Sequence, residues 1–186
     1  MSVDTGTPTT MKIIDNFITN EEADILRNYV LDNEDTVKGM GPDLYEGTKN
    51  DSLTGRWYLY NWLSSSTCGS ILIPKLTKEF PNLYIRLWAN VFRKGEGIAR
   101  HHHDQEYRLS GNLYLGGPDT ATYYEGTGPV QNKTGTLTIF DARVYHWVKP
   151  NETETPRVSM AFDVKDWNAL NSYYTHTFIP LGTHEN

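Results

Sequence analysis

YIRLWANVF, residues 84–92, opens a half of the chain in which short runs of β-branched and aromatic residues alternate with turn residues. The later runs are LSGNLYL (109–115), ATYY (121–124), GTLTIF (135–140), YHWV (145–148) and RVSMAFDV (157–164). Turns rich in glycine, proline and asparagine separate the runs at spacings typical of an antiparallel sandwich or jelly roll. The sequence therefore predicts a strand-rich core from about residue 83 to residue 166.

The residues before this core favour helices. A capping box formed by Thr19 and Glu22, followed by apolar residues at helical spacing, predicts a helix that runs to about Asn33. Three further elements are expected: a short strand at 11–14, an aromatic strand at 56–62, and a second helix within 66–80 with Pro74 near its first turn. Helices first and strands afterwards predict an α+β, mainly β architecture, in which helices buttress one sheet.

One domain is expected for residues 1–186, because this length suits a single core. Its expected parts are a flexible tail at 1–10, helical support at 11–82, a jelly-roll core at 83–166 and a C-terminal extension at 167–186. Residues 35–51 are rich in helix-breaking glycine and proline, and such long loops often close over sites. A loop is therefore expected there, and the sequence leaves open whether it forms a lid.

Composition narrows the functional classes. The net charge of -6 and the pI of about 5.5 argue against nucleic acid as the partner. Cys68 is the only cysteine, which excludes an internal disulfide and a multi-cysteine zinc site. The N-terminal residues lack the order of a secretory signal, and no apolar run reaches the length of a membrane span. We therefore expect a cytoplasmic protein without a membrane partner.

Three histidines followed by an aspartate, His101 to Asp104, are the first candidate site. Residues two apart on an extended chain point the same way, so His102 and Asp104 share one face. His146 follows in a segment whose apolar neighbours place it near the core. Two histidines and one carboxylate are the facial set of non-haem Fe(II) oxygenases, which leaves the opposite coordination positions open.

Arg157 and Ser159 form the second candidate site. They open the last predicted strand, where Val158, Met160, Phe162 and Val164 make the apolar face. Alternation places Arg157 and Ser159 together on the other face. A planar guanidinium beside a hydroxyl suits a carboxylate ligand.

The order of these motifs, HxD, a distal histidine and then RxS, resembles the 2-oxoglutarate/Fe(II)-dependent dioxygenase superfamily in its prolyl-4-hydroxylase-like branch. The run LWANVFRKGEGIARHHHD (87–104) and the run LSGNLYL are similar to those of its uncharacterised bacterial and phage members. The resemblance covers about residues 84–164. It implies a double-stranded β-helix (a cupin-like jelly roll) and iron ligation by His102, Asp104 and His146. It also implies cosubstrate binding by Arg157, assisted by Ser159, Tyr114 and Asn90.

The resemblance further implies an enzyme that uses Fe(II), 2-oxoglutarate and dioxygen to hydroxylate a C–H bond, releasing succinate and CO2. A small molecule or a peptide, such as a peptidyl proline, is the expected substrate. The sequence gives neither its identity nor the oligomeric state.

Several alternatives stay open. Alternation also pairs His101 with His103, and HxH followed by a distant histidine is how cupins hold metal, which would give a metal enzyme or sugar-binding module without 2-oxoglutarate. A degenerate barrel that only binds partners is a third class. The aromatic residues of 56–62 either pack the core or stack on substrate. Three charged residues either reach a polar substrate or are solvated, namely Arg56, Glu106 and Arg108.

Overall fold

The computed structural model describes residues 11–45, 51–103, 106–166 and 177–182. The expected tail at 1–10 lies outside these residues, as do most of the C-terminal extension and part of the loop expected at 35–51. Within the described residues, no helix has both the length and the apolar character needed to cross a bilayer.

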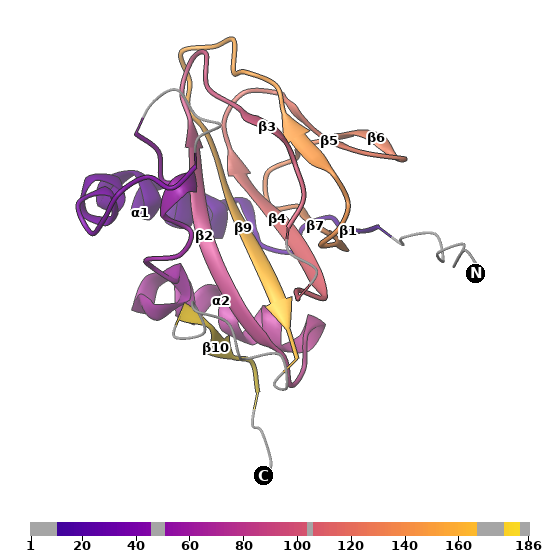
Figure 1. Ribbon diagram of the computed structural model, residues 1–186. Coiled ribbons are helices and arrows are strands. Elements are labelled where there is room, and N and C mark those ends of the chain that lie inside the picture. Colours follow the sequence, from indigo (N-terminus) through magenta and orange to yellow (C-terminus); the bar gives the residue numbers. More distant parts are fainter. Residues whose placement is uncertain (1–10, 46–50, 104–105, 167–176, 183–186) are drawn as a thin grey trace.

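Two antiparallel sheets face each other in the jelly roll (Figure 1). The six-stranded sheet has the order β1-β7-β4-β9-β2-β10, and the four-stranded sheet has the order β3-β8-β5-β6. The strands of the larger sheet are β1 (Lys12–Ile14), β2 (Tyr84–Phe92), β4 (Leu109–Gly116), β7 (Leu137–Asp141), β9 (Arg157–Lys165) and β10 (Ile179–Pro180). Those of the smaller sheet are β3 (Ile98–His101), β5 (Ala121–Tyr124), β6 (Gly128–Gln131) and β8 (His146–Val148). This architecture confirms the predicted fold class.

Two helices, α1 (Asn20–Lys38) and α2 (Ser66–Glu79), cover the outer face of the larger sheet (Figure 1). The capping box predicted at the start of α1 is present, since the Thr19 and Glu22 side chains each bond the other residue's backbone N–H. The helix runs five residues beyond the expected end, to Lys38. Pro74 lies inside α2 rather than near its first turn, because Ser65 caps a helix that begins earlier than expected.

The expected aromatic strand at 56–62 is wrong. The segment lies between two short 3₁₀ helices, η1 (Thr54–Arg56) and η2 (Trp62–Ser64). The backbone forms turns instead of a ladder, because the N–H groups of Trp57 and Leu59 donate to the carbonyls of Thr54 and Arg56. The buried Asn61 side chain anchors the segment: it donates to the carbonyls of Ile85 and Thr177 and accepts from the N–H groups of Leu63 and Leu87. Tyr60 and Trp62 pack against the core, as the core interpretation of the aromatic run predicts.

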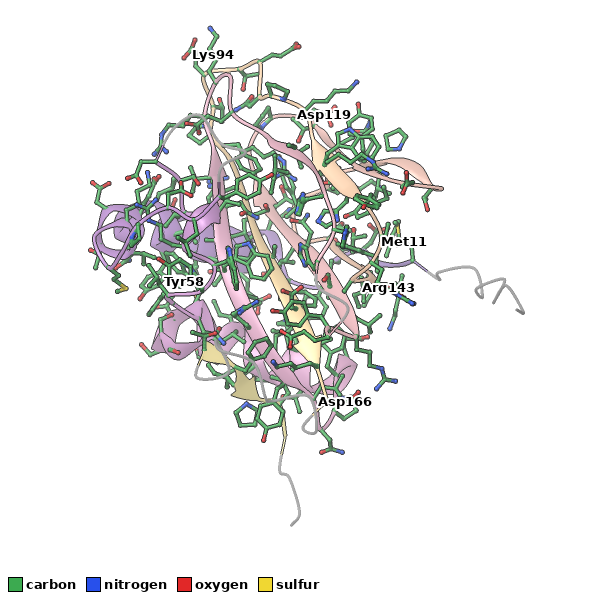
Figure 2. The ribbon with its side chains drawn as sticks, in the orientation of Figure 1. Met11, Tyr58, Lys94, Asp119, Arg143 and Asp166 are labelled. Carbon is green, nitrogen blue, oxygen red and sulfur yellow. The ribbon has the colours of Figure 1, made fainter. Side chains whose placement is uncertain are left out.

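Alternation along β2 and β9 divides the protein into a hydrophobic core and a polar interior. The outward faces of both strands pack with the helices in the core, and on β9 the predicted apolar face is fully buried. The inward faces carry Arg86, Trp88, Asn90 and Phe92 opposite Asp163, Ala161, Ser159 and Arg157. Figure 2 shows side chains filling the space between the sheets, with Lys94 and Asp119 near one end and Asp166 at the other. Polar side chains on a sheet face that lines a cavity are candidates for binding or catalysis.

Candidate active site

His101, His103 and His146 bring their ligand atoms within 4.8 Å of one another. The register of the smaller sheet explains this grouping, since His101 on β3 lies directly opposite His146 on β8. Directly paired residues point to the same face, and His103, two residues beyond His101, joins them. These three imidazoles form a cluster. The ring centroid of His146 lies 4.2 Å from that of His101 and 5.0 Å from that of His103.

Each of these rings has its Nδ1 held by an oxygen, which leaves Nε2 available to a ligand. The Nδ1 of His101 bonds the carbonyl of Ala99 at 2.8 Å, and that of His146 bonds the carbonyl of Val144 at 3.0 Å. The Nδ1 of His103 bonds Oδ1 of Asp163. Metal-binding histidines commonly donate their second N–H to a carbonyl or carboxylate in this way. The cluster is therefore built like a metal site.

Burial favours the neutral form of His101 and His146. It lowers the pKa of His101 to about 4 and that of His146 well below the usual value, and the neighbouring histidines lower both further. Neutral imidazole is the form that binds metal. A set of three imidazole nitrogens suits iron, nickel, copper or zinc.

Asp163 is the carboxylate of this site, and it lies behind His103. It is almost fully buried, and Oδ1 also accepts a hydrogen bond of 2.6 Å from Ser110. Burial raises the pKa of Asp163, but contacts with His103, Arg86 and Ser110 outweigh it and hold the pKa below its usual value. An ionised Asp163 orients His103 and makes its ring a stronger ligand.

The predicted ligand set, His102 with Asp104 and His146, is brought together only in part. His146 belongs to the cluster, whereas Asp104 lies outside the described residues. The ring of His102 lies 4.6 Å from that of Tyr145, and its Nδ1 bonds the carbonyl of His103. The alternation that pairs His101 with His146 turns His102 away from the cluster, so the geometry favours the alternative pairing of His101 with His103.

Arg157 lies where the second site was predicted, in an inner cavity that His101, His103 and His146 also line. It is 1% exposed; Nη1 donates to Ser159 at 3.2 Å and Nη2 donates to Thr122 at 3.1 Å. Nε has no partner, and no carboxylate of the described residues pairs with the guanidinium. Burial lowers the pKa of Arg157 to about 10, so it is a cation at neutral pH.

The residues predicted to assist Arg157 surround it. Ser159 accepts its hydrogen bond, and the Tyr114 ring lies 5.5 Å from its guanidinium carbon. Asn90 lines the same inner cavity and accepts a hydrogen bond of 2.8 Å from Thr54. A buried cation without a counter-ion favours the binding of an anion.

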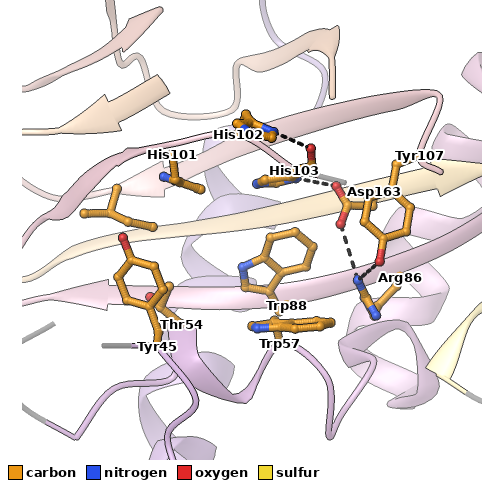
Figure 3. A pocket seen from close by; sticks show the side chains of 11 residues that line it. Tyr45, Thr54, Trp57, Arg86, Trp88, His101, His102, His103, Tyr107 and Asp163 are labelled. Atoms are coloured by element: carbon orange, nitrogen blue, oxygen red, sulfur yellow. Dashed lines mark hydrogen bonds and ion pairs between the residues drawn. The ribbon is translucent and has the colours of Figure 1, made fainter. Parts of the chain in front are cut away.

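A larger cavity of about 340 Å³ adjoins the histidines on the outer side (Figure 3). Trp57, Trp88 and Tyr107 give it aromatic walls, Tyr45 and Thr54 lie at one end, and Arg86 and Asp163 lie at the other. His101 and His103 line both the inner and the outer cavity. A metal on the cluster would therefore face both chambers.

Two of the charged residues considered as contacts for a polar substrate, Arg56 and Arg108, do not line the outer cavity. Arg56 is buried and holds the preceding loop, because it bonds the carbonyls of Gly41 and Ser52 and pairs with Asp43 at 3.5 Å. Arg108 is exposed and lies 3.5 Å from Asp166. Arg86, Asp163, Ser110 and Thr122 were not predicted, although a lone arginine in the apolar run of β2 was a signal.

Comparison with solved structures identifies the fold. A prolyl-4-hydroxylase from Pseudomonas putida superposes with a TM-score of 0.60 at 13% identity, covering 86% of this chain and 94% of that one. HygX from Streptomyces hygroscopicus, with nickel, 2-oxoglutarate and hygromycin B bound, gives 0.61 at 11% identity, covering 86% and 84%. The α-ketoglutarate-dependent epimerase SnoN of nogalamycin biosynthesis gives 0.61 at 14% identity, covering 84% and 76%. The fold is that of the 2-oxoglutarate/Fe(II) oxygenases, as the sequence resemblance predicted.

The family follows from the sequence profile of aspartyl/asparaginyl β-hydroxylases, which matches residues 56–166, more than half of the chain. This chain belongs to that family. Among curated proteins, no significant relative is found.

Proposed function

We propose that this protein is an Fe(II)- and 2-oxoglutarate-dependent oxygenase that hydroxylates a C–H bond of a small molecule or peptide and releases succinate and CO2. One observation carries the proposal: three imidazoles with anchored Nδ1 atoms converge beside a buried guanidinium that pairs with no carboxylate of the described residues. Family membership and fold support the same class.

The donor set fits Fe(II). His101, His103 and His146 would hold the ion, and a ligand set without a carboxylate would leave its charge available to an anionic cosubstrate. Bound Fe(II) with 2-oxoglutarate supplies the dioxygen activation that side chains lack. Asp163 keeps the Nδ1 proton on His103, so that Nε2 stays a lone-pair donor.

Arg157 would bind the distal carboxylate of 2-oxoglutarate. Its guanidinium donates hydrogen bonds to Ser159 and Thr122, and its Nε has no acceptor among the described residues. The surrounding aromatic rings exclude water, which strengthens a charge-assisted hydrogen bond there. Phe92 lies 5.5 Å from the guanidinium carbon. The substrate would enter the outer cavity, on the other side of the histidines.

A cupin-type metal protein without 2-oxoglutarate is the second candidate, and the pairing of His101 with His103 favours it. Arg157 separates the two candidates, because a buried cation beside the metal cluster has no role in metal binding alone.

Anaerobic titration of the full chain with Fe(II), and then with 2-oxoglutarate, tests the proposal. We expect a visible absorption band that needs both additions, followed by succinate formation when air is admitted. Zinc in place of Fe(II) is the control, since it has no such band. Metal binding without any effect of 2-oxoglutarate would instead support the cupin-type candidate.

A further inference from the structure

Arg86 is a second buried arginine in the polar interior, at the far end of the outer cavity from Tyr45 and Thr54 (Figure 3). It is 1% exposed and lies on β2 directly opposite Asp163 on β9. The backbone at this position is held by the antiparallel pairing of β2 with β9, which runs along the whole of β2. Burying a charged side chain on such a strand without a partner is unfavourable.

The guanidinium of Arg86 is only partly satisfied. Nη2 donates to the Tyr107 hydroxyl at 3.1 Å and approaches Oδ2 of Asp163 at 3.4 Å. Nε and Nη1 have no hydrogen-bond partner among the described residues. A well-paired structural arginine would use these nitrogens, so they indicate an absent acceptor.

Asp163 does not supply that acceptor. Its Oδ1 already accepts hydrogen bonds from His103 and Ser110, and only a long contact from Oδ2 reaches Arg86. The negative charge of Asp163 is thus divided between the histidine cluster and the arginine. An additional anion at Arg86 would complete the charge balance of the cavity.

Aromatic rings surround the same guanidinium. Its central carbon lies 4.3 Å from the Trp57 ring centroid, 4.8 Å from that of Phe178 and 5.5 Å from that of Tyr107. These rings fix the guanidinium plane and keep water away from it. They also offer flat apolar walls to the body of a ligand.

We propose that the outer cavity binds a carboxylate-bearing substrate and that Arg86 binds its carboxylate. The inference rests on the proposed function, because it assigns this cavity to the substrate. A volume of about 340 Å³ fits a small organic acid or one side chain of a peptide. With its carboxylate on Arg86, the ligand body lies along Trp57 and Trp88, which places its carbon atoms toward the histidines.

Matched pairs of carboxylates and amides test this inference. The probes are 3-phenylpropionate with 3-phenylpropanamide, and 4-methylpentanoate with 4-methylpentanamide. Each is titrated calorimetrically into the full chain, anaerobically, with Fe(II) and saturating 2-oxoglutarate, so that the Arg157 site is filled. We expect at least one carboxylate to bind at least tenfold more tightly than its amide. Failure of both carboxylates to bind, or equal affinities within both pairs, would overturn the inference.

Two substitutions, Arg86→Met and Arg86→Lys, test whether Arg86 causes the preference for the carboxylate over the amide. Arg86→Met should remove the carboxylate preference, while affinity for the amide and for 2-oxoglutarate stays within twofold of wild type. Arg86→Lys keeps the charge beside Asp163 and should retain part of the preference. If Arg86→Met shows no cooperative thermal transition and is therefore not folded, the carboxylate preference of Arg86→Lys is compared with that of wild type instead. A preference that survives either folded substitution unchanged contradicts the role of Arg86.

Arg157→Met separates this inference from the proposed function. Titrated without 2-oxoglutarate, it should keep the carboxylate preference and lose only cosubstrate binding. If Arg86→Met weakens 2-oxoglutarate instead, Arg86 is the cosubstrate site and the inference is wrong. If wild type binds no 2-oxoglutarate but keeps an Arg86-dependent carboxylate preference, the proposed cosubstrate fails while the anion site stands.

Discussion

Arg86 and Arg157 lie at opposite ends of one sheet face, where Arg86 pairs in register with Asp163, and Arg157 with Phe92. Six residue steps along β2 separate the two pairs, which is roughly 20 Å along an extended strand. The histidine cluster borders the cavities at both ends. The β2 and β9 pair thus places one arginine at each of the two cavities, and the candidate metal-binding histidines lie between them.

Replacing Arg157 should separate cosubstrate binding from metal binding. Arg157→Met removes charge-assisted hydrogen bonds worth about 1.5–3 kcal/mol, so affinity for 2-oxoglutarate should fall roughly 10- to 150-fold. Affinity for Fe(II) alone should not change, because Arg157 contacts none of the three imidazoles through a hydrogen bond. Calorimetric titrations of both ligands measure the two effects. Unchanged 2-oxoglutarate affinity would remove the role assigned to Arg157.

Single histidine substitutions decide between the two pairings. His103→Ala should lower metal affinity by at least roughly 100-fold, since it removes a ligand and the partner of Asp163. His102→Ala is the matched control and should bind metal like wild type, because its ring packs on Tyr145. Asp104→Asn tests the remaining member of the predicted set. Loss of metal in the His102 and Asp104 variants, with retention in His103→Ala, would restore the pairing predicted from sequence.

Much of the fold could be predicted because several strands of both sheets have clear sequence patterns. β2 and β5 have the bounds of the runs YIRLWANVF and ATYY, and β9 extends its run by one residue. β6 was expected to be a turn, since Gly128 and Pro129 begin it, and pairing with β5 overrides their local preference. The run at 56–62 was misassigned because its backbone forms turns and tertiary hydrogen bonds anchor its Asn61 side chain, which no local pattern shows.

The sequence could predict that histidines form the candidate site, but not which of the three consecutive histidines point into it. Three consecutive histidines occupy both faces of an extended chain, so alternation alone allows either His102 or the His101 and His103 pair. Only the cross-strand register with His146 distinguishes them. Arg157 and Ser159 could be assigned because an apolar alternation fixes their face. Asp163 occupies that same face, and its role behind His103 depends on contacts between distant segments.

Glu34 should make stability depend on pH. Its carboxylate accepts hydrogen bonds of 2.9 and 2.7 Å from Arg93 and pairs with Lys38 at 2.6 Å. Burial raises the pKa of Glu34, but these cations outweigh it and hold the pKa below its usual value. Because the folded pKa is depressed, the stabilisation is complete above the ordinary pKa of about 4.5 and is lost as the pH falls through the folded value.

Glu34→Gln is expected to lower the free energy of unfolding by roughly 1–2 kcal/mol at neutral pH, a modest figure because Arg93 is half exposed. The difference from wild type should shrink in acid, as measured by urea unfolding at a series of pH values. Glu152→Gln, at an exposed position, is the control for losing a carboxylate alone. A difference that stays constant into acid would show that the charge of Glu34 is not what stabilises the fold.

Gly111 is the position where the core has no room for a methyl group. It lies on β4 opposite Phe162, and an added Cβ would fall 2.1 Å from the ring's Cζ and 2.5 Å from Cε1. The ring cannot move away easily, because it is fully buried and packs edge-on against Phe80. Overpacking of this kind costs about 1–3 kcal/mol, so Gly111→Ala should lower the Tm by roughly 3–10 °C.

Gly39→Ala is the matched control for Gly111→Ala. Gly39 ends α1 with a right-handed φ of -68°. Its added Cβ would come no closer than 3.4 Å to another atom, so the Tm should change little. Calorimetry of both variants beside wild type makes the comparison. If Gly111→Ala melts with wild type, the Phe162 ring repacks at little cost, and the close approach of β4 to β9 does not require glycine.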